Sequence, residues 1–198
     1  MWRDKPYELQ LYDALNRRKL LSKEERKKYN KLQVGYQGEL LLDDYVGKIP
    51  DECIMLQDLS LSFKNRYFQI DSILIINNQL HLFEVKNYQG EYYYEKDKLY
   101  LEQGVEVDDP LTQLKRSESL LRQLVSGLGF HISIQARVVF VNSEFTLYLE
   151  SRHPKILLST QLNRYFRQFQ KNTPIDPIFH SLAIGVEQSL LKSEFNTH

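Results

Sequence analysis

Few residues in this chain are suited to thiol or zinc chemistry. The 198-residue sequence has a single cysteine, Cys53, so an intrachain disulfide is impossible. Cys53 begins an apolar run, where a small buried side chain is expected rather than a nucleophile. The five histidines are scattered without the close pairing typical of zinc sites. Thiol catalysis and zinc binding are therefore poor hypotheses.

Long apolar runs are also missing. None approaches the roughly 20 residues that a membrane-spanning helix needs, and residues 1–6 lack the apolar centre of a signal peptide. The sequence contains neither a glycine-rich phosphate loop nor the Gly-x-Ser-x-Gly motif that anchors a hydrolase triad. Its 42% hydrophobic and 26% charged residues are ordinary for a globular protein. We therefore expect a cytoplasmic protein that does not bind membranes.

Charge is balanced overall but unevenly distributed. The formal net charge is zero, yet residues 1–33 contain ten Lys or Arg and five Asp or Glu, a net +5. Helices are predicted over residues 7–20 and 23–33, the second opened by a capping box of Ser22 and Glu25. Such a basic extension either contacts nucleic acid or is simply a solvated surface. We favour the solvated surface, because charge runs usually are surfaces.

The most informative segment is a predicted β-hairpin over residues 68–86. Two apolar runs flank Asn77 and Asn78, which tolerate the left-handed backbone of a tight turn. With these residues as the turn, opposed residues have numbers that sum to 155, so Asp71 faces Glu84. Opposed Cβ atoms lie about 4.5–5.5 Å apart, and like charges placed there repel. A divalent cation held by both carboxylates would offset this repulsion.

Lys86 shares the face of Glu84, because side chains alternate along a strand. It either belongs to a catalytic site or forms a salt bridge within the hairpin, and we favour catalysis because such bridges contribute little to stability. Both faces of the hairpin are apolar, which predicts a central place in a sheet covered by helices. We also expect the second strand to continue past Gly90 into residues 91–94.

Two predicted helices carry further polar candidates. A helix over residues 40–46 should follow a short bend flanked by Gly35 and Gly38. Glu39 lies on the inward stripe of this helix, where a carboxylate is costly unless it is paired or bound to metal. The alternative is a partly hydrated glutamate that is favoured near a helix start.

Asp109 is a good N-cap and Pro110 suits the first helical position, so a helix should run from there to about residue 126. Gln113 lies in its first turn and is either a surface residue or one that projects toward a site at the sheet edge. Lys115 and Arg116 follow, and either can contact a phosphate backbone.

These segments resemble a known family. Asp71 followed by Glu84-Val85-Lys86 is similar to the Asp…Glu-x-Lys signature of the PD-(D/E)xK nuclease superfamily, with Ile70 in place of the proline. The chain more specifically resembles the nuclease-related domain, abbreviated NERD, over roughly residues 34–170. The strings that carry this resemblance are Gly35-Tyr36-Gln37-Gly38-Glu39, Glu84-Val85-Lys86-Asn87-Tyr88-Gln89-Gly90 and Asp109-Pro110-Leu111-Thr112-Gln113-Leu114.

The resemblance implies an α/β fold with a restriction-endonuclease-like core. Its central mixed β-sheet is flanked by helices on both faces in the order αβββαβ, and a helical extension precedes it. The expected division of the chain is a basic helical extension at 1–33, a NERD-like nuclease domain at 34–171, and a C-terminal segment at 172–198 whose role the sequence does not indicate.

The resemblance also implies a metal-dependent nuclease that hydrolyses phosphodiester bonds, with DNA as the expected substrate. Asp71, Glu84 and the backbone carbonyl of Val85 would hold Mg²⁺ or Mn²⁺. Lys86 would orient a water molecule and offset negative charge. Glu39 and Gln113 would support the site, and Glu39 is also a candidate metal ligand.

A second hypothesis is a nucleic-acid-binding or assembly module of a DNA-processing complex, which keeps the nuclease fold without cleaving. Residues 92–94, three consecutive tyrosines, and the basic extension could then serve stacking and phosphate contact. The joint presence of Asp71, Glu84 and Lys86 favours the enzyme. A homodimer and membership of a larger DNA-processing or defence complex are compatible with both hypotheses.

Overall fold

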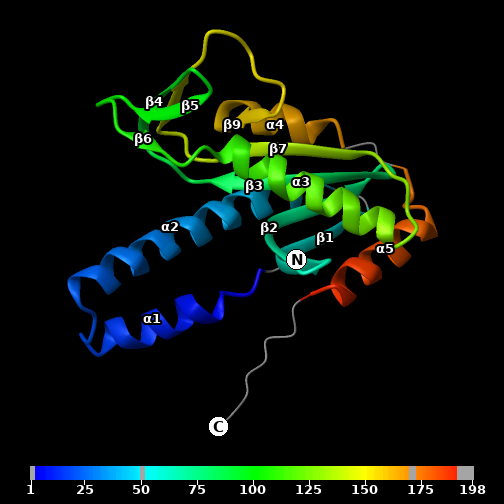
Figure 1. Ribbon diagram of the computed structural model, residues 1–198, viewed down its shortest axis with the longest axis horizontal. Helices are drawn as coiled ribbons and strands as arrows, with labels where there is room; N and C mark the ends of the chain where they lie inside the picture. The colour runs from blue at the N-terminus through cyan, green and yellow to red at the C-terminus, as the bar shows by residue number, and fades with distance from the viewer. Residues whose placement is uncertain (1–2, 50–51, 170–172, 191–198) are drawn as a thin grey trace.

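The computed structural model describes residues 3–49, 52–169 and 173–190 (Figure 1). Its main sheet has the strand order β1-β2-β3-β7-β9. The strands are β1 (Ile54–Phe63), β2 (Arg66–Ile76), β3 (Gln79–Lys86), β7 (Ile134–Phe140) and β9 (Ile156–Leu158). The first three are antiparallel, whereas β7 and β9 run parallel to β3. The sheet is therefore mixed, as the resemblance to the nuclease family implies.

Helices cover both faces of this sheet. They are α1 (Tyr7–Arg17), α2 (Lys23–Val46), α3 (Pro110–Gly127), α4 (Ser159–Arg167) and α5 (Pro177–Gln188). Helices α3 and α5 pack on one face, and α2 and α4 on the other, while α1 lies along α2 (Figure 1). The order α2-β1-β2-β3-α3-β7 confirms the αβββαβ arrangement. No helix in the described ranges is long and apolar enough to cross a membrane.

The central hairpin has the predicted register. Five opposed pairs run from Ile76–Gln79 to Ser72–Phe83. Asn77 and Asn78 both have positive φ, 51° and 56°, which matches the twist of the strands. The Asn77 side chain also accepts a hydrogen bond from the Thr173 N–H (2.9 Å), and Asn78 accepts one from the Asp176 N–H (3.0 Å).

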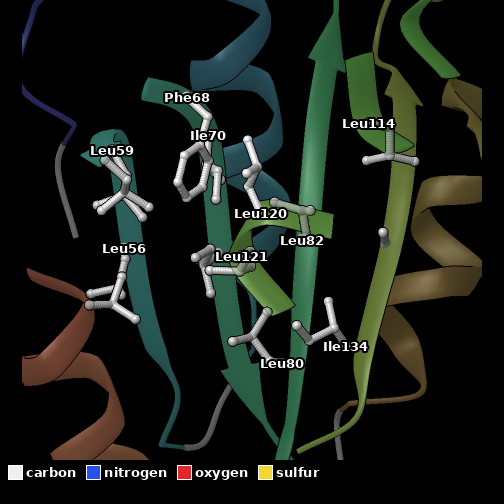
Figure 2. Close-up of a cluster of buried hydrophobic side chains, with 14 of the residues drawn as sticks. Leu56, Leu59, Phe68, Ile70, Leu80, Leu82, Leu114, Leu120, Leu121 and Ile134 are labelled. Carbon is white, nitrogen blue, oxygen red and sulfur yellow. The ribbon is translucent and has the colours of Figure 1, made fainter. Parts of the chain in front are cut away.

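Apolar side chains on the two faces of the hairpin enter two separate cores. Ile73, Ile75, Leu80 and Leu82 join the cluster beneath α3. Figure 2 labels Leu80 and Leu82 in this cluster, with Leu114, Leu120 and Leu121 of α3. Leu74, Ile76, Phe83 and Val85 join the cluster beneath α2 and α4. Strand β3 therefore lies at the buried centre of the sheet, which confirms the prediction from its two-sided apolar pattern.

The predicted bend after residue 33 is wrong, because α2 continues without interruption to Val46. Gly38 instead allows α2 to approach the end of β3: a Cβ atom there would lie 2.7 Å from the Cβ of Asn87. Asn87 also donates a hydrogen bond to the Val34 carbonyl (2.9 Å). The glycine serves a close contact between segments, and this contact outweighs its low helix propensity.

The predicted continuation of the second hairpin strand past Gly90 is also wrong, because β3 ends at Lys86 and residues 91–94 lie in a separate strand. Strand β4 (Gly90–Glu95) leaves the main sheet and joins β5 (Lys98–Leu101), β6 (Glu106–Val107) and β8 (Phe145–Tyr148). These form a second sheet with the order β6-β5-β4-β8. Stacked aromatic rings connect the two sheets, with Phe140 of β7 4.1 Å from Phe145 between ring centroids. Burial of these rings directs β4 away from the main sheet.

The C-terminal segment contributes to the main core. Ile175, Phe179, Leu182 and Val186 are buried in the cluster beneath α3, so α5 completes that face of the sheet. The expected boundary between residues 171 and 172 lies outside the described residues. Residues 173–190 are thus held both by this core and by the hairpin turn.

His81 supplies a test of the core beneath α4. It is buried beside Phe83, Tyr165 and Phe169, and its Nε2 has no hydrogen-bond partner among the described residues. Burial, aided by the positive charge of Arg137, lowers the pKa of His81 to about 4.

Between pH 6.5 and 4 the unfolded chain therefore binds a proton that the folded protein excludes, and stability falls as the pH falls. This residue should cost the wild type about 2 kcal/mol of unfolding free energy between pH 7 and pH 5. His81→Phe should remove that loss, as measured by urea unfolding at both pH values. Equal losses in the two proteins would contradict the assignment.

Candidate active site

Asp71 lies where strands β2 and β3 stop pairing through their backbones. The last pair of the ladder is Ser72–Phe83. At the next position the Asp71 carboxylate itself accepts a hydrogen bond from the Val85 N–H, at 2.7 Å from Oδ2. Asp71 and Glu84 are therefore not the directly opposed pair of the ladder that the sequence predicts. Instead the Asp71 carboxylate takes the place of the backbone carbonyl that would accept from the Val85 N–H.

Strand β1 has a matching irregularity. Asp58 would pair with Asp71, but it adopts a positive φ of 49° and the ladder skips both residues. The inward alternation shifts here: Ile70 and Ile73, three positions apart, both enter the core beneath α3. Non-glycine residues with positive φ concentrate at functional sites, where the surrounding structure holds them. This break places the Asp71 side chain at the end of β3.

Glu84 and Lys86 lie beside Asp71 at the end of β3. Glu84 is only 3% exposed. The Lys86 ammonium donates to Glu84 Oε1 at 2.6 Å and to Gln113 Oε1 at 3.1 Å. The Asp109 carboxylate caps α3 by accepting hydrogen bonds from the N–H groups of Leu111 and Thr112. This cap fixes the first turn of α3 over the end of β3, so Gln113 in that turn reaches Lys86. The structure thus brings four of the predicted residues together.

Asp71 and Glu84 have the raised pKa values expected of buried carboxylates. Burial and the negative charge of Asp71 raise the pKa of Glu84 to about 7, against the opposing influence of Lys86. Burial raises the pKa of Asp71 as well, although the Val85 N–H, Lys86 and Arg3 oppose it. Burial lowers the pKa of Lys86, but the two carboxylates outweigh it and the net shift is upward. The site therefore favours additional positive charge.

Arg3 is the residue that the sequence reading missed. Its side chain is buried and donates to Asp43 (2.8 Å), Glu39 (2.9 Å), the Asp71 carbonyl (3.1 Å) and Ser72 Oγ (2.7 Å). It therefore joins the N-terminal extension to both α2 and β2. The one available signal was Glu39 itself, an inward carboxylate that required a cation.

Glu39 lies on the α2 side of the sheet. Its carboxylate accepts a hydrogen bond from Arg3, and among the described residues no hydrogen bond joins Glu39 to Asp71 or Glu84. Burial raises the pKa of Glu39 to about 7 against the influence of Arg3, and the charge of Asp71 adds to the rise. Glu39 is thus coupled to Asp71 through Arg3 rather than placed beside Glu84.

Lys115 and Arg116, the two predicted phosphate-contact residues, border different hollows on the two sides of α3. Arg116 lies with Gln113 along two hollows near the site. Lys115 faces another hollow, beside Tyr94 and His153. Tyr92 is buried and the Tyr94 hydroxyl donates to Asp109 at 2.6 Å, so these two tyrosines serve packing. The structure favours Arg116 over Lys115 and over this tyrosine run as a neighbour of the site.

The donor set is suitable for a hard divalent cation. Within the described ranges no group of three or more His, Cys, Asp or Glu side chains is placed to hold a metal ion. Burial raises the pKa of both Asp71 and Glu84 even with Lys86 beside them, so a further positive charge at these two carboxylates is favoured. Mg²⁺ commonly takes one or two carboxylates and completes its shell with water and substrate phosphate. The residues present therefore fit such an ion.

Fold and site together define a nuclease-related α/β protein. A family model described as the nuclease-related domain, NERD, matches residues 34–141, more than half of the chain. The chain belongs to the NERD family, and the predicted resemblance is confirmed.

Among solved structures, the chain is similar to Can2 from Sulfobacillus thermosulfidooxidans, determined in complex with cyclic tetra-adenylate (cA4). The TM-score is 0.45 at 15% sequence identity, and the match covers 86% of this chain and 47% of that chain. This chain thus spans about half the length of that protein. A comparison with curated proteins found no match.

Replacing Arg3 tests its structural role. Arg3→Ala should lower the free energy of unfolding by about 3 kcal/mol, because it leaves Glu39 and Asp43 without their buried partner. Arg3→Lys should recover only part of this loss, since an ammonium lacks the planar fork of donors. Urea unfolding at neutral pH measures both variants. Lys5→Ala, which removes an exposed pair with Asp13, is the matched control and should change little. Equal stability of Arg3→Ala and wild type would refute the role.

Proposed function

We propose that this protein is a metal-dependent nuclease that hydrolyses phosphodiester bonds, with DNA as its expected substrate. The observation that supports this most strongly is the convergence of Asp71, Glu84 and Lys86 at the end of β3. A buried pair of carboxylates is destabilising unless a cation compensates it, so its presence calls for a functional explanation. The proposed cation is Mg²⁺ or Mn²⁺, held by Asp71, Glu84 and the Val85 carbonyl.

When bound, such an ion polarises the scissile phosphate and lowers the pKa of a coordinated water. The protein residues position the reactants around it. Lys86, held by Glu84 and Gln113, supplies a fixed positive charge next to the phosphate that undergoes attack. Asp71 is immobilised by the Val85 N–H, so its free oxygen keeps one orientation. Arg3 holds the backbone of Asp71 from the other side of the sheet.

Lys86→Ala is the direct test of this proposal. Purified wild type and variant are incubated with plasmid, linear duplex, single-stranded DNA and RNA, each with Mg²⁺, Mn²⁺ or EDTA. We expect metal-dependent cleavage by the wild type and a loss of about 100-fold or more in the variant, because one preorganised charge is removed. Lys48→Ala is the control, since Lys48 lies just beyond the end of α2 with its ammonium over the Tyr45 ring. It should cleave like the wild type.

Absence of cleavage by the wild type on all four substrates, with nucleic-acid binding unchanged in Lys86→Ala, would contradict the nuclease assignment. The binding or assembly module would then be the better account.

Asp71→Asn separates the functional from the structural role of the carboxylate. The amide keeps an oxygen acceptor for the Val85 N–H and removes one of two buried like charges. In EDTA the variant should therefore be more stable than the wild type by about 1 kcal/mol, yet it should not cleave. Added Mg²⁺ should raise the melting temperature of the wild type and leave that of the variant unchanged. A variant that is less stable in EDTA would show that the charge itself holds the fold.

A further inference from the structure

A hollow of about 590 Å³ opens directly beside the proposed site. The β1–β2 hairpin forms one side and the first turns of α3 form the other. Six of the residues that line it, which we call the Tyr67 hollow, are Ser60, Tyr67, Gln69, Gln113, Arg116 and Ser117. Its volume lies within the range of about 300–1,000 Å³ that is typical of small-ligand sites.

The hollow forms because β2 is paired with β3 along only part of its length. The residues of β2 that precede Asp71 pair with β1, and their other edge faces α3 instead of a strand. Ser117 Oγ donates to the Gln69 carbonyl across this gap at 3.3 Å. The same break that places Asp71 therefore opens a cleft next to it.

Gln113 connects the Tyr67 hollow to the proposed catalytic residues. Its Oε1 accepts a hydrogen bond from the Lys86 ammonium, and Gln113 is also one of the residues that line the hollow. The amide nitrogen of Gln113 has no partner among the described residues and can donate to a ligand. A group bound in the hollow would thus lie one side chain away from Lys86.

Tyr67 is the exposed aromatic residue among those that line the hollow. Its side chain is 63% exposed, and its ring contacts neither another ring nor a cation within the described ranges. An exposed aromatic ring without a packing partner provides a surface on which a nucleobase can stack. Tyr92, by contrast, is buried among other rings.

Charge distinguishes this hollow from its neighbour beyond Gln113. Among the described residues that line the Tyr67 hollow, Arg116 is the only charged one. The neighbouring hollow, which Arg116 also borders, has one other cation and four acids, namely Lys98, Asp97, Glu106, Asp108 and Asp109. A polyanion is therefore favoured on the Tyr67 side, where Arg116 can pair with a phosphate.

We propose that the Tyr67 hollow binds an unpaired nucleotide that adjoins the scissile phosphate. Tyr67 stacks on the base, Gln69 and Gln113 offer amide groups to its edge, and Arg116 contacts a phosphate. A base in a duplex is already stacked and paired, so this arrangement selects single-stranded or locally unpaired nucleic acid. The inference rests on the proposed nuclease function for the position of the phosphate, but not for binding itself.

The test measures binding without cleavage. Fluorescence anisotropy of a short labelled single strand and of its duplex is recorded in EDTA, and again in Ca²⁺, a hard cation with the same preference for oxygen ligands. Tyr67→Ala should weaken single-strand binding by about 10-fold or more and duplex binding much less. Tyr67→Phe keeps the stacking ring and should bind like the wild type. Tyr148→Ala, a change at a 56% exposed tyrosine in the second sheet, is the control and should have no effect.

The proposal is overturned if the wild type binds no single strand under either condition, or if Tyr67→Ala binds it normally. It is also overturned if Tyr67→Ala loses single-strand and duplex affinity equally. Loss in Tyr67→Ala with recovery in Tyr67→Phe supports it and excludes a folding defect. A protein that binds through Tyr67 but cleaves none of the substrates would refute the nuclease function alone.

Discussion

The burial of two carboxylates at one point of the sheet governs the rest of this structure. Burial raises the pKa of both Asp71 and Glu84, and the charge of Asp71 raises that of Glu84 further. Two buried carboxylates of this kind cost free energy unless positive charge lies beside them. Lys86 supplies it from the face of α3, and Arg3 from the face of α2. The first turn of α3 and the N-terminal segment are positioned by these two cations.

Arg3 makes the N-terminal extension part of the hydrogen bonding around Asp71 and Glu39. The family match begins at residue 34, yet a side chain from outside it completes the hydrogen bonding of Asp71 and Glu39. The continuous helix α2 passes through the expected boundary and carries the extension into the same unit. The basic residues of the extension thus differ in role: Arg3 is buried at the site, whereas Lys5 and Lys28 form ion pairs with other residues of the extension.

Local chemistry explains which features were predictable. The register of the hairpin followed from Asn77 and Asn78, and the start of α3 from Asp109 and Pro110, because each signal acts on its immediate neighbours. The two-sided apolar pattern of β3 likewise revealed its central position. Arg3 could not be found in this way, because its partners lie 36 to 69 residues away. The positive φ of Asp58 and the departure of β4 depend on contacts between strands that no short pattern specifies.

The contacts of the Asn77–Asn78 turn also impose an order on folding. Asn77 and Asn78 bind the backbone of residues 96 and 98 positions later, so the tip of the central hairpin is tied to a segment far along the chain. Closing so long a loop is entropically costly and slow compared with local pairing. The hairpin can form early from its own turn, but its fixed position comes late. During synthesis the tip of the hairpin therefore gains these two hydrogen bonds only after residues 173–176 have emerged.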